Sequence, residues 1–273
     1  MTIGAFIGAC VAYFSGNGWL GFFAGGLSGA ILGAVHAIAC IQFGADQTIS
    51  GTAINFIGPG LAVFLCKAIF DNSSDSPALD TAAKLPKMFE GVFKSGSFGY
   101  NVFSTYSVAY LSFVLVFVVW FVFYKTKLGM HLRAVGEHPQ ACATLGVDVY
   151  LTRYICVILS GFLAGLGGAL LYLANSGKYL QVLDIIAPEG FSGISVALLG
   201  LSSPIGILFS GLFIAHITVG GYNMQLFDFA PEVIDMIIAA IVYCGALSLL
   251  FKHLIYKFIK NKKKAVDNPA KKE

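Results

Sequence analysis

Long stretches without charge are the feature that most constrains how this chain can fold. Residues 105–124, for example, contain only apolar, aromatic and small polar side chains. A helix of about 20 residues is roughly 30 Å long, which matches the hydrocarbon core of a bilayer. Across the 273 residues, 57% are hydrophobic and 11% are charged, whereas a soluble domain carries about 25% charged residues. We therefore expect an integral membrane protein.

Apolar segments recur along the whole chain. We place them at residues 1–14, 19–43, 51–70, 105–124, 154–174, 187–201, 204–219 and 231–251. Within a bilayer, backbone polar groups must be paired inside the protein, and a helix pairs its own. The predicted fold class is an all-α, polytopic transmembrane helical bundle with about seven or eight hydrophobic segments. The pair 187–219 is short and interrupted at Pro204, so it forms either two short crossings or a re-entrant hairpin.

The basic residues predict the orientation, because they favour the cytoplasmic side of a membrane protein. They cluster in a polar loop at 125–153 and in the lysine-rich tail at 252–273. We expect both to be cytoplasmic, with the C-terminus inside and the polar stretch 71–101 outside. Residues 1–251 would then form a single, multi-pass transmembrane domain, and the tail would also contact anionic lipid.

Glycines at four-residue spacing predict a helix–helix interface. This spacing places them on one face of a helix, where the small side chain lets a second backbone approach closely. Glycine supplies no chemistry of its own, so we interpret these positions as packing positions. They are Gly21, Gly25, Gly29 and Gly33, with a weaker version at Gly161 and Gly165.

The polar loop contains signals for a short helix. Pro139 suits the first helical position, and Gly146 suits the left-handed position after the end. The helix from Pro139 to Leu145 would be only about 10 Å long, and so short a helix needs support from flanking structure or a partner. Its small and apolar residues suit a groove on another protein. The alternative is a helix-capped loop without a partner.

The loop sequence GMHLRAVGEHPQACATLGVDVYLTRY resembles the cytoplasmic coupling loop of ABC-importer permeases that serve branched-chain amino acids, simple sugars and nucleosides. The family's Arg-Ala-x-Gly-Glu-x-Pro core is matched from Arg133 to Pro139, followed by Ala141 and a Leu-Gly step. In that family, the short helix sits in a cleft of the ATP-hydrolysing subunit, with Arg133 and Glu137 as polar contacts at the rim here. The resemblance implies ATPase coupling by Arg133, Gly136, Glu137, His138, Pro139, Ala141, Leu145 and Gly146.

The resemblance also implies the partners and the location of the chain. The partners are ABC ATPase subunits, a second permease subunit that is a related chain or a copy, and an external substrate-binding protein in a bacterial plasma membrane. ATP and Mg would bind the ATPase, because this sequence has no G-x-x-x-x-G-K-[ST] phosphate loop. We expect no enzyme activity, cofactor or metal on this chain, no catalytic residue, and no nucleic acid partner.

Further segments extend the resemblance. GADQTISGTAIN (residues 44–55) and SGFLAGLGGALLYLA (residues 160–174) are similar to family segments, and ISGTAIN, VGEHPQA and LGV are closest to the nucleoside-uptake branch. Two features depart from the family. Members usually carry another hydrophobic helix ahead of this start, so we expect residue 1 to fall inside the family's fold. The turn GLSSPIG (residues 200–206) lacks the family's basic or aromatic anchor.

Polar side chains within apolar segments indicate a substrate path, because such groups are costly in a bilayer and face the protein interior or water. They could bind a sugar hydroxyl or a base edge, and nearby aromatic rings could stack on a base. The alternative for each is a polar residue that only holds helices together. The candidates are His36, Asp46, Gln47, Ser50, Asn55, Phe56, Phe191 and His216.

We predict that the chain is the permease subunit of an ATP-driven nucleoside importer. The same class of permease for simple sugars or branched-chain amino acids is the first alternative. A secondary carrier or channel is a second alternative, although carboxylates deep in the apolar segments are sparse. A structural half whose partner lines the path is a third.

Overall fold

The computed structural model describes residues 1–70, 85–86, 106–174, 188–224, 233, 236–241 and 243. Nearly all of the predicted external stretch 71–101, much of the segment 231–251 and the whole tail 252–273 lie outside these residues. The described residues belong to two compact units, Met1–Gly190 and Phe191–Glu273. Each unit is described by itself.

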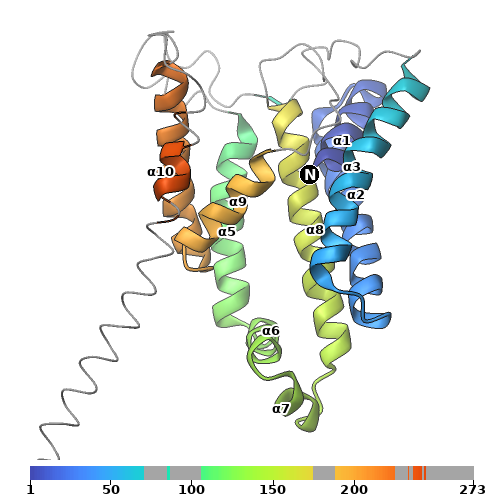
Figure 1. Cartoon of the computed structure of the whole chain (residues 1–273), viewed down its shortest axis with the longest axis vertical. Helices are drawn as coiled ribbons and strands as arrows, with labels where there is room; N and C mark the ends of the chain where they lie inside the picture. Colours follow the sequence, from blue (N-terminus) through green and yellow to red (C-terminus); the bar gives the residue numbers. More distant parts are fainter. Residues whose placement is uncertain are drawn as a thin grey trace, which may run out of the picture. The chain divides into compact units, whose positions relative to one another are not determined.

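The first unit is built from helices (Figure 1). They are α1 (Thr2–Ser15), α2 (Gly18–Ala37), the π-helical continuation η1 (Ile38–Gln42), α3 (Gln47–Ile69), α5 (Ser107–Lys125), α6 (Lys127–Glu137), α7 (Pro139–Thr144) and α8 (Val149–Leu173). In the second unit, α9 (Pro188–Leu199), which begins at the boundary, is followed by α10 (Pro204–Met224). The prediction of an all-helical chain is confirmed for the described residues.

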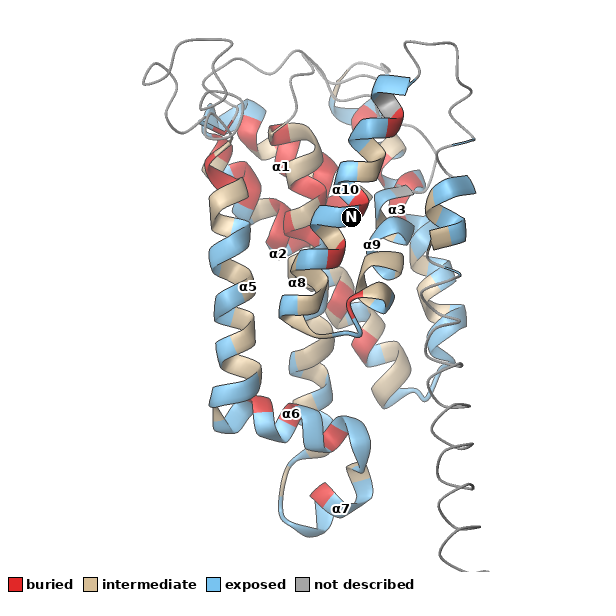
Figure 2. Ribbon diagram, turned by 90° about the vertical axis from the view of Figure 1, so that its left-hand side faces the viewer, coloured by how far each residue is buried: buried red, intermediate tan, exposed pale blue. Residues whose placement is uncertain are grey.

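Within the described residues, five helical segments are long and apolar enough to cross a membrane: Gly18–Gln42, Gln47–Ile69, Ser107–Lys125, Val149–Leu173 and Pro204–Gly221. Thr2–Ser15 and Glu189–Leu199 are apolar but shorter. The segment predicted at 204–219 is longer in the structure, because α10 continues to Met224. Only a minority of the residues in the long helices are buried in the isolated chain, as expected for helices that face lipid or a partner (Figure 2).

The tightest packing joins α2 to α8 through their glycines. A Cβ at Gly29 would lie 2.7 Å from the Cα of Gly165, and a Cβ at Gly33 would lie 3.2 Å from the Cα of Gly161. Gly25 meets the backbone carbonyl of Gly4 on α1 in the same way. The structure therefore brings together the two glycine series from the sequence, because only glycine lets these backbones approach so closely.

An apolar cluster completes the core at one end of α8. Ala169 and Leu173 of α8 pack with Phe22 of α2 and Val108 of α5. Leu85 joins the same cluster, is only 2% exposed, and donates its backbone N–H to the carbonyl of Leu173 at 3.2 Å. The buried residues of α8 all lie between Gly165 and Leu173 (Figure 2). Toward the other end of α8, which follows α7, no residue before Gly165 is buried.

Candidate functional site

The corner between α5 and α6 is fixed by Thr126 and Gly129. The Thr126 hydroxyl donates to the carbonyl of Val122 at 2.6 Å and accepts from the backbone N–H of Gly129 at 3.3 Å. Gly129 is buried against the backbones of Val122 and Phe123, where a Cβ would collide with main-chain atoms. Because main-chain atoms cannot move aside, the corner holds α6 firmly to α5. The sequence analysis did not predict α6.

Helix α7 forms over Pro139–Thr144, one residue shorter than predicted. Pro139 is its first residue, and Gly146 ends the turn at φ 79. The N–H of Val147 donates to the carbonyl of Cys142 at 3.1 Å, which closes the C-terminal end. Asp148 then caps α8 by accepting from the N–H of Leu151 at 2.9 Å. Hydrogen bonds therefore define the loop on the C-terminal side of its short helix.

The outer surface of this loop exposes a large apolar side chain. Leu145 is 81% exposed, whereas Cys142 behind it is buried. Glu137 and His138 are also exposed, and Pro139 is half-buried. The α6–α7 arm, which is residues 126–148, lies beyond the end of α5 and the start of α8 (Figures 1 and 2). The arm therefore carries a leucine side chain that stays exposed in this unit.

Arg133 makes a contact that the sequence analysis did not predict. Its guanidinium carbon lies 4.8 Å from the centre of the Tyr124 ring, which is a cation–π distance. This contact links α6 to the last turn of α5 and complements the Thr126 corner. Arg133 and Glu137 are both exposed in the isolated chain, and Arg133 also contacts the Tyr124 ring of α5.

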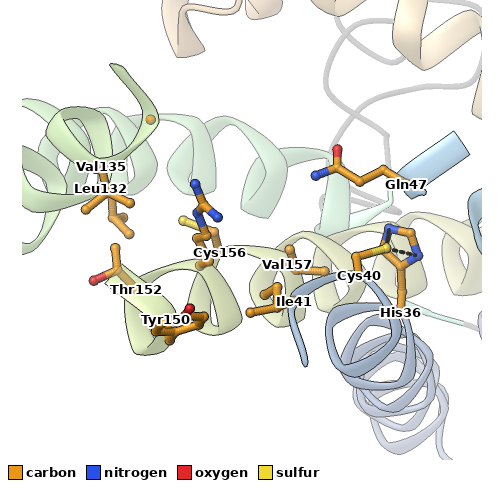
Figure 3. A pocket seen from close by; sticks show the side chains of 12 residues that line it. His36, Cys40, Ile41, Gln47, Leu132, Val135, Tyr150, Thr152, Cys156 and Val157 are labelled. Atoms are coloured by element: carbon orange, nitrogen blue, oxygen red, sulfur yellow. Dashed lines mark hydrogen bonds between the residues drawn. The ribbon is translucent and has the colours of Figure 1, made fainter. Parts of the chain in front are cut away.

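A pocket of about 530 Å³ lies behind the arm (Figure 3). Its walls come from the end of α2 with η1, the start of α3, the inner face of α6 and the first turns of α8. The lining residues are His36, Cys40, Ile41, Gln47, Leu132, Val135, Gly136, Tyr150, Thr152, Arg153, Cys156 and Val157.

A second pocket of about 320 Å³ lies between α2, α3 and α8 and contains Gly29, Asn55 and Ser160 in its lining. His36 and Val157 line both pockets. Nδ1 of His36 is hydrogen-bonded to the Ser50 hydroxyl at 2.9 Å, which fixes the ring against α3. Cys40 lies 3.7 Å from the same nitrogen. The two pockets therefore share a wall that includes a positioned histidine.

The predicted substrate-path residues separate into three groups. His36, Gln47 and Asn55 line pockets of the first unit, and Ser50 positions His36. Asp46 and Phe56 do not line these pockets; Phe56 is 75% exposed. Phe191 and His216 belong to the second unit, where His216 lines a mainly apolar pocket of about 250 Å³ with Val233 and Ile237.

Asp46 has a structural role in the observed geometry. Its carboxylate accepts from the N–H of Thr48 at 2.8 Å and from the N–H of Ile49 at 3.1 Å, so it caps α3. These two backbone hydrogen bonds, that of Ile49 first, lower the pKa of the exposed Asp46 carboxyl below its ordinary value. Asp46 is therefore the N-cap of α3 and is charged at neutral pH.

Sequence reasoning missed several pocket residues, including Cys40, Tyr150, Thr152 and Cys156. Their types are common, and their position opposite α6 becomes visible only when α8 packs on α2. Arg153 had been assigned a topological role alone. Among the residues that the structure describes, no group of three His, Cys, Asp or Glu side chains is placed to hold a metal ion.

Comparison with known families decides the class of this protein. Residues 1–246 match the model of the family described as branched-chain amino acid transport system / permease component. The chain belongs to this family. As an ABC transporter permease it is a non-catalytic, multi-pass membrane subunit that works with ATPase subunits and a binding protein. The resemblance noted from the coupling-loop sequence is confirmed at the level of the family.

Curated relatives of this permease carry different substrate names. The nucleoside ABC transporter permease protein NupC of Lactococcus lactis is 32% identical over 91% of this chain and 82% of its own length. The guanosine ABC transporter permease protein NupQ of Bacillus subtilis is 33% identical over 85% of this chain and 75% of its own length. A putative glucose ABC transporter permease protein of Haloferax volcanii is 33% identical over 84% of this chain and 65% of its own length. No solved structure matches the permease significantly.

Proposed function

We propose that this permease imports nucleosides and forms half of the translocation path of an ABC importer. The similarity to a nucleoside permease and a guanosine permease, at 32% and 33% identity over most of the chain, carries the substrate assignment. The sequence segments ISGTAIN, VGEHPQA and LGV support the same branch. Sugars are the second candidate, because the relative named for glucose is equally similar.

The α6–α7 arm is the proposed docking element for the ATPase. Three features support this role: α7 is too short to be stable alone, hydrogen bonds close its end, and Leu145 stands exposed at 81%. Glu137 is exposed beside it and supplies a polar contact at the rim of the ATPase cleft. When the docked α7 moves, α6 would move with it, and the fixed corner at Gly129 would transmit that movement to α5.

The arrangement in the membrane follows from the same proposal. Residues 1–251 form one permease domain, with residues 125–153 and the tail 252–273 in the cytoplasm and residues 71–101 outside. A second permease subunit, either a related chain or a copy, completes the path. The paired α9 and α10 form either two crossings or a re-entrant hairpin.

Uptake of labelled guanosine and adenosine in cells that lack this chain tests the proposal. The intact gene should restore uptake, and excess ribose, glucose or leucine should not compete. A Glu137→Ala, Leu145→Arg version should reach the membrane but restore no uptake and retain less ATPase on purification. Restored nucleoside uptake that glucose abolishes would favour a sugar permease. Normal uptake and ATPase retention in the double variant would exclude the docking role.

A further inference from the structure

The pocket behind the α6–α7 arm combines polar and apolar walls. His36 and Gln47 present polar groups from the α2–α3 side, and Thr152 and Arg153 present them from α8. Leu132 and Val135 of α6 supply the apolar wall and are buried. Figure 3 shows the side chains of Leu132 and Val135 on the opposite side of the pocket from His36 and Cys40. Its volume of about 530 Å³ is in the range of small-molecule sites.

The lining lacks the acidic side chains that would neutralise a cationic group on a cargo. None of the twelve lining residues, all of them described, is an aspartate or glutamate. An amino acid carries an ammonium group, and this lining offers no carboxylate to neutralise that charge when it leaves water. A nucleoside is uncharged and offers a planar base and hydroxyl groups instead. The Tyr150 ring provides a face for stacking, and His36, Gln47, Thr152 and Arg153 provide hydrogen-bonding partners.

One wall of the pocket belongs to the arm that is proposed to dock on the ATPase. Gly136, Val135 and Leu132 lie on α6, which is separated from α7 by a single residue. Any displacement of α7 therefore changes the wall directly. The facing wall contains Cys40 and Ile41 of the π-helical segment η1. Such π-helical insertions are frequent at functional sites, because the helix there departs from regular hydrogen bonding.

We propose that this pocket is a release chamber for the nucleoside, with α6 as its movable wall. Cargo would occupy it between Tyr150 on α8 and His36 on α2 before it leaves the permease. A shift of α6 that is driven by the ATPase would change the space between Val135 and Thr152. This inference rests on the proposed nucleoside import and adds the residues at which the cargo is held.

A pair of tryptophan variants tests the chamber. Thr152 lines the pocket, whereas its neighbour Leu151 is exposed and does not line it. Thr152→Trp should fill the pocket and reduce nucleoside uptake to background, while Leu151→Trp should support normal uptake. Both variants should retain the ATPase subunit on purification. Normal uptake with Thr152→Trp would overturn the chamber and leave nucleoside import intact, whereas no uptake with the unsubstituted gene would overturn the proposed function itself.

A direct labelling experiment covers the case in which Thr152→Trp does not assemble. The purified importer complex is irradiated with 8-azidoadenosine, and modified peptides of the permease are identified by mass spectrometry. Modification within residues 150–157 that unlabelled adenosine suppresses, and that glucose does not, supports the chamber. Specific modification confined to other parts of the complex overturns it. The same experiment on the Leu151→Trp complex should give the unsubstituted pattern.

Discussion

At the level of single residues, Asp46 distinguishes a helix cap from a substrate contact. Its carboxylate accepts two backbone hydrogen bonds at the start of α3, from Thr48 and Ile49. The substrate-path hypothesis drew on its position between two apolar segments. The geometry gives it a structural partner on its own helix, and it lines neither of the two pockets of the first unit described above. A polar residue near a membrane segment can thus be fully explained by local backbone geometry.

The cap gives Asp46 a defined pH dependence. Because its folded pKa is lowered, its contribution to stability is complete above the unfolded pKa and is lost as the pH falls through the folded value. Asp46→Ala should lower the thermal unfolding temperature of the purified complex at about pH 7, and the difference from the unsubstituted protein should shrink towards about pH 3. Asp46→Asn keeps an acceptor and should be closer to the unsubstituted protein at about pH 7. Lost uptake with unchanged unfolding temperature in Asp46→Ala would instead place Asp46 in the substrate path.

At the level of helices, the corner between α5 and α6 should be intolerant of any side chain at Gly129. A Cβ there would collide with the backbones of Val122 and Phe123. Gly129→Ala should therefore destabilise the purified permease by about 1–3 kcal/mol, the usual cost of overpacking, and weaken ATPase retention. Met130→Ala is the matched control, because Met130 is adjacent and exposed. Equal unfolding temperatures for the two variants would show that the corner is flexible.

The helices also show which structural features could be predicted from the sequence alone. The glycine spacing from Gly21 to Gly33 indicated an interface. The structure places Gly25, Gly29 and Gly33 against Gly161 and Gly165 on α8, and Gly21 against Gly8 and Ala12 on α1. Pro139 and Gly146 marked the ends of the short helix to within one or two residues. Local rules suffice for such features, because they depend on periodicity and backbone conformation.

Other features required the assembled fold. Helix α6 was missed. Its buried apolar side chains, Leu132 and Val135, are two positions in a largely polar stretch, and the residues that face them across the pocket come from elsewhere in the chain. The pocket behind it joins residues that are about 120 positions apart, such as His36 and Cys156. No spacing rule connects such residues, because tertiary packing alone places them together.

At the level of the whole molecule, the basic residues predict which ends of the helices face the cytoplasm. Lys125 and Arg153 flank the α6–α7 arm, Lys127 lies within it, and lysines continue through the tail 252–273. If the arm docks on an ATPase, it must lie on the side where ATP is hydrolysed. The predicted orientation and the proposed ATPase docking therefore depend on each other. If the arm lay outside, α7 could not dock on the ATPase.

Reporter fusions to truncated chains test this orientation. A fluorescent reporter that matures only in the cytoplasm should be active after Leu145 and after Glu273, and inactive after Leu85. Alkaline phosphatase, which needs the oxidising outer side, should show the opposite pattern. Replacing Lys125 and Lys127 together by glutamine should reduce cytoplasmic signal after Leu145, because the basic bias before the fusion point is weakened. Phosphatase activity after Leu145 in the unsubstituted chain would place the arm outside and exclude ATPase docking by α7.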